Sequence, residues 1–180
     1  EADQDSIRKL IAGGLAIDYA EYCAYQHHPA RGGWKSLNFL IDKGLCTGVG
    51  DFFANLFTPE RGIRFPDFPP PAAVITAVRA AGGIAVLAHP GSDFHGTELE
   101  ATLDDFAGED IGGVECFHPS HSAETTRQAV AWCRRKGLLV TGGSDCHGNF
   151  VPKRRVGMPP IDLEQLTLGD LLEKAFSPVG

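Results

Sequence analysis

Three short apolar runs, each followed by a polar loop, constrain the fold of this chain more than any other feature. The runs cover residues 84–88, 112–117 and 138–142, and patterns typical of helices separate them. Continuous apolar strands that alternate with helices indicate a parallel sheet covered by helices. The runs begin roughly 25 to 30 residues apart, which suits successive βα units. We therefore predict an α/β fold from residue 70 onward.

The chain before residue 70 has a different organisation. Short helical patterns separated by loops lead into a proline-rich stretch, FTPERGIRFPDFPPP. Because proline lacks a backbone N–H and restricts its neighbour, this stretch cannot hold a regular element and is a connector. We predict a helical segment with its connector over residues 1–69 and the strand-bearing part over residues 70–180.

Composition excludes several functional classes. The net charge of −7 argues against broad binding to a phosphate backbone, which relies on a surplus of Lys and Arg. The five cysteines show no C-x-x-C spacing, which favours reduced thiols in a cytoplasmic protein. No apolar stretch approaches the ~18 residues of a membrane span, so we expect no membrane partner.

Histidines and carboxylates follow the three apolar runs. His89 comes directly after the first run, His118 and His121 follow the second, and Asp145 and His147 follow the third. The carboxyl ends of parallel strands meet at one edge of the sheet, where active sites form. Neutral imidazoles and carboxylates are ligands of Zn, Mn and Fe. We therefore predict a metal site with His89, Asp145 and His147 as ligands.

The remaining polar residues of these loops leave more than one interpretation open. His121 lies at the start of a predicted helix, so metal ligation, contact with a substrate phosphate and helix capping are all compatible with its position. Glu115, inside the second run, is either a ligand or a buried partner that orients a histidine. We expect His118 and His95 at the surface. The absence of a clustered Ser or Cys nucleophile favours metal-assisted hydrolysis over acyl-enzyme chemistry.

The three strand motifs also carry a family resemblance. GGIAVLAHPG, GGVECFHPSHS and LLVTGGSDCHG, in this order, resemble the carboxyl-terminal half of the PHP (polymerase and histidinol phosphatase) superfamily, and more closely its bacterial metal-dependent phosphoesterases. The segment from RGGWKSLNFLIDKG to PPAAVITAVRAAGG is similar to a helical insertion before the A-H-P strand. The resemblance implies a partial, distorted βα barrel with parallel strands, preceded by a small helical insertion subdomain.

The resemblance also implies roles for individual residues. His89 matches the ligand of the A-H-P motif, and Asp145 and His147 match the closing D-x-H ligands. His121 matches a residue near the substrate in some members, which makes it our candidate catalytic residue. Members of the family hold two or three Mn, Fe or Zn ions and hydrolyse phosphate esters, including small nucleotides and oligonucleotide ends.

Two basic residues beside the insertion helix are candidates for substrate binding. We predict that Arg31 and Lys35 bind the substrate phosphate, and a solvated basic surface is the alternative. Two other functions compete with phosphoester hydrolysis: a non-catalytic binding or assembly module, and an amidohydrolase-like metal enzyme that acts on C–N bonds. The two cations favour the phosphoesterase, because a phosphate substrate needs them and an amide does not.

One departure from the family pattern limits what this chain can do by itself. The H-x-H strand, the S-D-G-like turn and the metal-binding Glu that open the family's sequence have no counterpart here, so the chain matches roughly the last two-thirds of such an enzyme. We therefore expect it to bind at most one metal and to be weakly active or inactive alone. The missing amino-terminal half of the barrel is an expected partner, and an exposed sheet edge favours a homo-oligomer.

Overall fold

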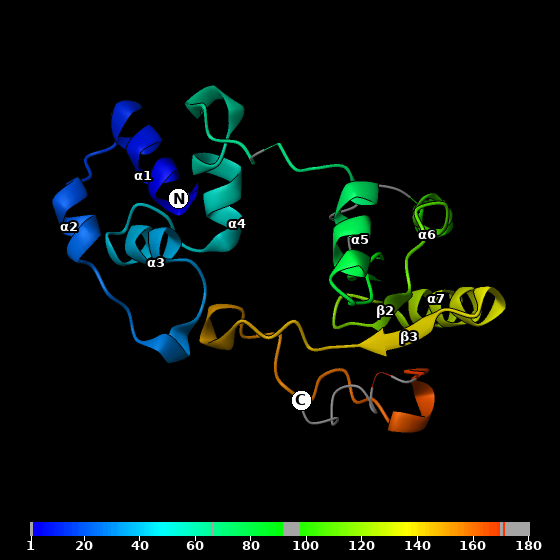
Figure 1. Cartoon of the computed structure of the whole chain (residues 1–180). Coiled ribbons are helices and arrows are strands. Elements are labelled where there is room, and N and C mark those ends of the chain that lie inside the picture. Colours follow the sequence, from blue (N-terminus) through cyan, green and yellow to red (C-terminus); the bar gives the residue numbers. More distant parts are fainter. Residues whose placement is uncertain (1, 66, 92–97, 170, 172–180) are drawn as a thin grey trace, which may run out of the picture. The chain divides into compact units, whose positions relative to one another are not determined.

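The chain folds into two compact units (Figure 1). The computed structural model describes residues 2–65, 67–91, 98–169 and 171. Unit 1 comprises Glu1–Phe68 together with His147–Lys153, and unit 2 comprises Pro69–Cys146 together with Arg154–Gly180. The chain therefore leaves unit 2 after Cys146 and returns to it at Arg154. The interpretation of unit 1 as an insertion subdomain and of unit 2 as part of a barrel stays a prediction.

Unit 1 is a small helical body. Its helices are α1 (Ala2–Ala12), α2 (Tyr19–Ala24), α3 (Lys35–Asp42) and α4 (Val49–Asp51), with a π-helical turn at Phe52–Leu56 and 3-10 turns at Pro29–Arg31 and Pro59–Arg61. Their apolar faces form one core that includes Ile7, Leu10, Tyr22, Leu37, Phe39 and Leu40. The Asp3 carboxylate accepts the Ser36 backbone N–H at 3.1 Å, and so places a negative charge at the N-terminus of α3.

Two glycines in unit 1 hold the returning segment close to the 3-10 turn at Pro29–Arg31. Gly32 and Gly33 have φ angles of 67° and 73°, in the left-handed region that favours glycine. A Cβ at Gly32 would collide with the His147 carbonyl oxygen, and one at Gly33 would lie 2.5 Å from the Phe150 ring. The sequence A-R-G-G therefore permits residues 147–150 to pack directly on this turn.

Unit 2 contains a three-stranded parallel sheet. Its elements are α5 (Pro71–Ala80), β1 (Val86–Leu87), α6 (Leu99–Ala107), β2 (Gly113–Phe117), α7 (Ala123–Lys136) and β3 (Leu139–Gly142). The strand order is β1-β2-β3 with both pairs parallel, so the predicted parallel α/β arrangement is confirmed, as an open sheet. Within the described ranges, no helix has the length and apolar character needed to cross a membrane.

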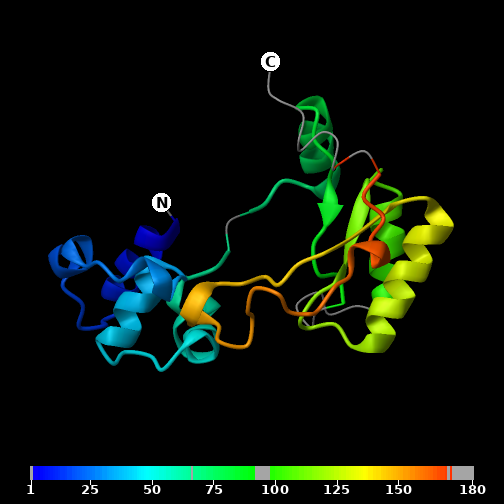
Figure 2. The same ribbon diagram turned by 90° about the horizontal axis from the view of Figure 1, so that it is seen from below.

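Helix α7 covers the sheet and closes the core of unit 2 (Figure 2). Val114 and Cys116 on β2 and Val140 on β3 are fully buried, and they pack in one cluster with Trp132 and Cys133 of α7. The helix begins at Ser122, whose hydroxyl accepts the Thr125 backbone N–H, and it ends at Gly137 in the left-handed conformation. These are the start and stop signals visible in the sequence.

The close packing of β2 on β3 leads to a first prediction. A Cβ at Gly113 would lie 2.7 Å from the Leu139 Cβ and 3.0 Å from the Leu139 carbonyl oxygen. We expect Gly113→Ala to lower the free energy of unfolding by about 1–3 kcal/mol, measured by urea denaturation with tryptophan fluorescence. Gly108→Ala is the control, because its Cβ would meet only the Asp105 carbonyl oxygen, at 3.5 Å. An equal loss in both variants would contradict this account of strand packing.

Candidate functional site

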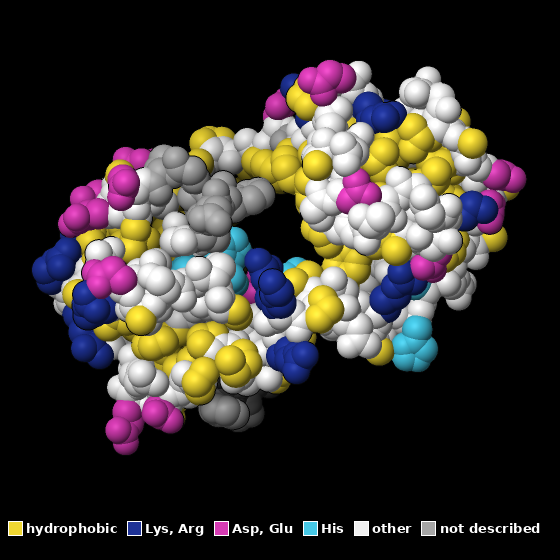
Figure 3. Space-filling model, turned by 180° about the vertical axis from the view of Figure 1, so that it is seen from behind, with side chains coloured by type: hydrophobic (Ala, Val, Ile, Leu, Met, Phe, Trp, Pro, Cys, Tyr) yellow, Lys and Arg dark blue, Asp and Glu magenta, His cyan; other side chains and the backbone are white. Residues whose placement is uncertain are grey.

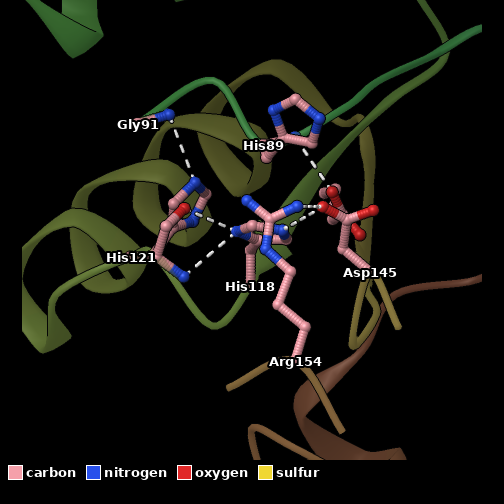
Figure 4. Close-up of polar contacts among 8 residues, drawn as sticks. His89, Gly91, His118, His121, Asp145 and Arg154 are labelled. Carbon is pink, nitrogen blue, oxygen red and sulfur yellow. Dashed lines mark hydrogen bonds and ion pairs between the residues drawn. The ribbon is translucent and has the colours of Figure 1, made fainter. Parts of the chain in front are cut away.

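Three histidines form a row at the carboxyl edge of the sheet in unit 2 (Figure 4). His89 follows β1, while His118 and His121 follow β2. The ring centroids of His89 and His118 are 5.1 Å apart, and those of His118 and His121 are 5.4 Å apart. Figure 3 shows histidine side chains, in cyan, reaching the surface of this unit. Parallel pairing thus brings together imidazoles from loops that are distant in the sequence.

His118 is the buried centre of this row. Its Nδ1 accepts the Ser120 backbone N–H at 3.1 Å and lies 2.6 Å from the Ser120 hydroxyl. The proton therefore sits on Nε2, which faces the Asp145 Oδ2 at 3.4 Å. Burial lowers the pKa of His118, against the opposing effect of the Glu115 and Asp145 carboxylates. A neutral imidazole that donates toward Asp145 is the state this environment favours.

The expectation that His118 lies at the surface was wrong, because only 2% of the residue is exposed. Val114, Cys116 and His118 lie at every second position, and alternate residues of a strand point to the same side. The period-two pattern of buried residues thus continues one step past the end of β2. That pattern was the signal in the sequence that could have identified the residue. His95, given the same expectation, lies outside the described residues.

Two backbone groups fix the orientation of His121. Its Nδ1–H donates to the Cys116 carbonyl oxygen at 2.9 Å, because a carbonyl can only accept. Its Nε2 accepts the Gly91 backbone N–H at 3.2 Å, so the ring is neutral with its lone pair on Nε2. A Cβ at Gly91 would collide with the Thr125 side chain, so glycine is required for this approach. The imidazole links the loops that follow β1 and β2.

Strained backbone marks the ends of β1 and β3. His89 has a φ of 32° and Asp145 a φ of 45°, left-handed values that cost a non-glycine residue about 1–3 kcal/mol. At His89 a hydrogen bond offsets part of this conformational cost, because the Glu115 Oε2 accepts the His89 backbone N–H at 2.9 Å. Gly143 leaves room for this carboxylate, since a Cβ there would lie 2.8 Å from Glu115 Oε1. The Glu115 side chain therefore holds His89 by a hydrogen bond to the His89 backbone.

Arg154 completes the cluster. Its guanidinium forms an ion pair with the Asp145 carboxylate, and the two side chains are 34% and 25% exposed. Figure 4 shows Arg154 extending across His118 toward Asp145. No motif in the sequence indicates Arg154 as a residue of this site. The basic run Lys153 to Arg155, shortly after the D-x-H motif, was the available signal in the sequence. It does not indicate which of the three side chains pairs with the Asp145 carboxylate.

The cluster has donors of the kind that bind metals, yet its arrangement does not form a metal site. Among the residues that the structure describes, no group of three or more His, Cys, Asp or Glu side chains is placed to hold an ion. Two of the donors are also engaged by other groups: Asp145 pairs with Arg154, and the Nε2 of His121 accepts a backbone N–H. His147 is exposed and is counted with unit 1. Its predicted convergence with His89 and Asp145 stays a prediction.

The two predicted phosphate-binding residues lie in unit 1, where each has a partner. Arg31 forms a bidentate pair with Asp42, with both N–O distances 2.8 Å. The same carboxylate accepts the Tyr25 hydroxyl at 2.6 Å, and burial together with this bond raises the pKa of Tyr25 to about 12. Lys35 Nζ donates to the Cys23 carbonyl oxygen at 2.9 Å. Their role in binding a phosphate stays a prediction.

Two solved structures share the fold of this chain. A metal-dependent phosphoesterase from Bifidobacterium adolescentis matches 91% of this chain and 61% of its own, with a TM-score of 0.69 and 23% identity. An amidohydrolase from Chromobacterium violaceum, solved with bound sulfate and no metal, matches 81% of this chain and 52% of its own, with a TM-score of 0.59 and 23% identity. These likenesses confirm the fold, which is that of PHP-type phosphoesterases.

Curated relatives confirm the resemblance at the level of sequence. The phosphoribosyl 1,2-cyclic phosphate 1,2-diphosphodiesterase of Eggerthella lenta is 40% identical over 76 residues, which cover 42% of this chain and 28% of the relative. The 3′,5′-nucleoside bisphosphate phosphatase of Chromobacterium violaceum is 30% identical over 128 residues, or 68% of this chain and 45% of the relative. No family model matches the chain. The chain is thus related to PHP-type phosphoesterases and spans less than half the length of either curated relative.

The central position of His118 leads to a second prediction. His118→Ala leaves a cavity and removes the buried donor that faces Asp145. We expect it to lower the free energy of unfolding by about 1–3 kcal/mol, measured by urea denaturation. Glu109→Ala, at an exposed residue of the same unit, is the control and should change it by less than about 0.5 kcal/mol. Two equally small changes would show that His118 does not hold the cluster together.

Proposed function

We propose that this chain is part of a metal-dependent phosphoester hydrolase. The observation that carries the proposal is the row of His89, His118 and His121, with Asp145, at the carboxyl edge of a parallel sheet. The two curated relatives, both phosphoesterases by name, support the reaction class. The proposed substrates are small phosphorylated molecules, either nucleotides or the ends of oligonucleotides.

In this proposal His121 accepts a proton during the reaction, and His118 orients the Asp145 carboxylate. The Nε2 lone pair of His121 accepts the Gly91 backbone N–H in this structure, so the ring would act as a general base only once that hydrogen bond is released. Because the Cys116 carbonyl accepts the Nδ1–H, the ring keeps one tautomer and one orientation. His118, held neutral by burial, directs its Nε2–H toward the Asp145 carboxylate.

We retain His89, Asp145 and His147 as proposed ligands of a divalent Mn, Fe or Zn ion. Such an ion, when bound, supplies a Lewis acid that polarises phosphoryl oxygens and acidifies water. As arranged in this structure the described donors do not form its site, and the Asp145 carboxylate is paired with Arg154. Arg31 and Lys35 remain our proposed contacts to the substrate phosphate, which a guanidinium can bind through two parallel hydrogen bonds.

Two alternatives are retained and can be separated by experiment. One solved structure with this fold is an amidohydrolase by name, so hydrolysis of a C–N bond is the second candidate. The third is a binding or assembly module without catalysis. The curated relatives favour phosphoester hydrolysis over both.

The third prediction concerns activity. We expect the 180-residue chain with excess Mn²⁺ to hydrolyse an aryl phosphate and short oligonucleotides weakly or not at all, because the proposed ions need more ligands than it supplies. A longer form, extended to the length of the curated relatives, should hydrolyse them and lose activity with a chelator. An aryl amide assayed in parallel tests the alternative that the protein hydrolyses C–N bonds. Equal turnover of the phosphate substrates by the 180-residue chain and the longer form would contradict the argument that this chain lacks metal ligands. Hydrolysis of the amide alone would contradict the proposal of a phosphoesterase.

The fourth prediction tests the phosphate contact in the longer, active form. Arg31→Ala should raise the KM for a phosphate ester about tenfold, because a charged hydrogen-bond donor to the phosphate is lost. Lys43→Ala is the matched control, since Lys43 forms a comparable ion pair with Glu21 in the same unit, at 2.7 Å. Unchanged kinetics in Arg31→Ala would assign Arg31 to the solvated surface of unit 1.

A further inference from the structure

A strip of aromatic rings in unit 1 has no part in the function proposed above. This aromatic strip consists of Trp34, Phe53, Phe57, Phe65 and Phe68, which form a continuous series of ring contacts. The centroid separations run from 4.8 Å, between Phe57 and Phe65, to 6.4 Å, between Phe65 and Phe68. Aromatic rings attract one another at such distances, so the five side chains form one connected surface.

The aromatic strip has a supported side and an exposed side. Phe53 and Phe57 pack against the helical core of unit 1, while Trp34, Phe65 and Phe68 are 51%, 46% and 71% exposed. Within the described residues of unit 1, these three are the exposed large hydrophobic side chains, and all of them are aromatic. Exposed apolar side chains that lie together, unlike scattered single ones, mark a binding surface.

The chemistry of this surface fits a planar ligand that carries phosphate. Every nucleobase has a π face that stacks on a phenyl or indole ring, whatever its sequence. Arg61 and Arg64 belong to the segment that also carries Phe65 and Phe68, and neither forms an ion pair with a residue that the structure describes. A guanidinium beside stacked bases can bind the phosphate that links them.

A second copy of the chain fits the same surface less well. In a two-fold symmetric contact each surface meets its own copy, so the arginines of one chain would approach those of the other. Like charges brought together in this way repel, whereas a nucleic acid supplies the opposite charge. The aromatic strip and its arginines therefore favour a nucleic acid over self-association.

We propose that the aromatic strip stacks the bases of a short single-stranded nucleic acid, and that Arg64 contacts a phosphate between two of them. The inference rests on the proposed function for its choice of ligand, since nucleotides and oligonucleotide ends are the substrates proposed there, and it gives them a contact through their bases. The net charge of −7 limits the number of phosphate contacts, so stacking supplies most of the affinity.

The test measures binding to the 180-residue chain by fluorescence anisotropy, in a buffer with a chelator and no metal. One probe is a labelled thymidine oligomer of about eight nucleotides, within the usual range for a single-strand site. The other is an abasic oligomer of the same length, which keeps the phosphates and lacks the bases. We expect the thymidine oligomer to bind at least about tenfold more tightly, because only its bases can stack.

Four variants separate stacking from charge. Phe68→Ala should weaken binding of the thymidine oligomer about tenfold and leave the abasic oligomer unchanged. Arg64→Ala should weaken both about threefold, as the loss of an exposed charge does, and Asp67→Asn should strengthen both by removing an exposed negative charge. Leu163→Ala, at a 65% exposed apolar residue of unit 2, is the matched control and should change neither affinity.

Tryptophan fluorescence gives a second, direct measurement. Trp34 and Trp132 are the two tryptophans of the chain, and they are 51% and 2% exposed. A base stacked on an indole quenches its emission, so the thymidine oligomer should quench the exposed tryptophan and not the buried one. Trp34→Phe should abolish the quenching and keep most of the affinity, because a ring remains at this position.

Several outcomes would overturn the inference. Equal binding of the two oligomers, or no binding of either, would show that the bases do not stack on this chain. Equal effects of Phe68→Ala and Leu163→Ala would place the ligand elsewhere, and a dimer in sedimentation that Phe68→Ala dissociates would assign the aromatic strip to self-association.

These measurements are independent of the proposed hydrolysis. No metal is present and no turnover is measured, so an inactive longer form would contradict the proposed function and leave the binding result intact. Hydrolysis by the longer form without base-dependent binding would contradict only the role of the aromatic strip.

Discussion

Parallel pairing of β2 with both of its neighbours is the constraint on which the rest of unit 2 depends. Gly113 lies opposite Val86 on one side and Leu139 on the other, so one residue sets the register of both pairs. Because the strands run in the same direction, their polar loops must all emerge at one edge. The meeting of His89, His118, His121 and Asp145 follows from this register, and the rings of His118 and His121 are then fixed by local hydrogen bonds.

Much of unit 2 could be predicted from the sequence because its signals are local. The apolar runs predicted the strands, and α7 begins and ends at residue types, Ser122 and Gly137, that favour the ends of helices. The burial of His118 was also encoded, in the period-two pattern of Val114 and Cys116, but a histidine just after a strand invites the expectation of exposure. The pairing of Arg154 with Asp145 could not be predicted, because the chain crosses into unit 1 and back between them.

The D-x-H motif shows how a contiguous motif can be divided by packing. Asp145 is counted with unit 2 and His147 with unit 1, although a single residue separates them. Residues 147–150 are held by the close approach of Gly32 and Gly33, which are more than a hundred positions earlier in the chain. Such a contact is possible because these two residues have no side chains. The periodicity and composition of the sequence do not indicate which distant segment packs against them.

His121 forms two hydrogen bonds, one through each ring nitrogen, and one of them depends on the protonation of the ring. Nε2 either accepts the Gly91 N–H or carries a proton of its own, since an imidazolium has no lone pair left. Protonation and attachment to the loop after β1 are therefore mutually exclusive, whereas the bond to the Cys116 carbonyl survives in both states. A proton on Nε2 therefore removes the hydrogen bond to Gly91, whereas the Glu115 carboxylate still holds the His89 backbone N–H of the same loop, so acid–base chemistry at this ring would loosen the edge of the sheet without detaching the loop.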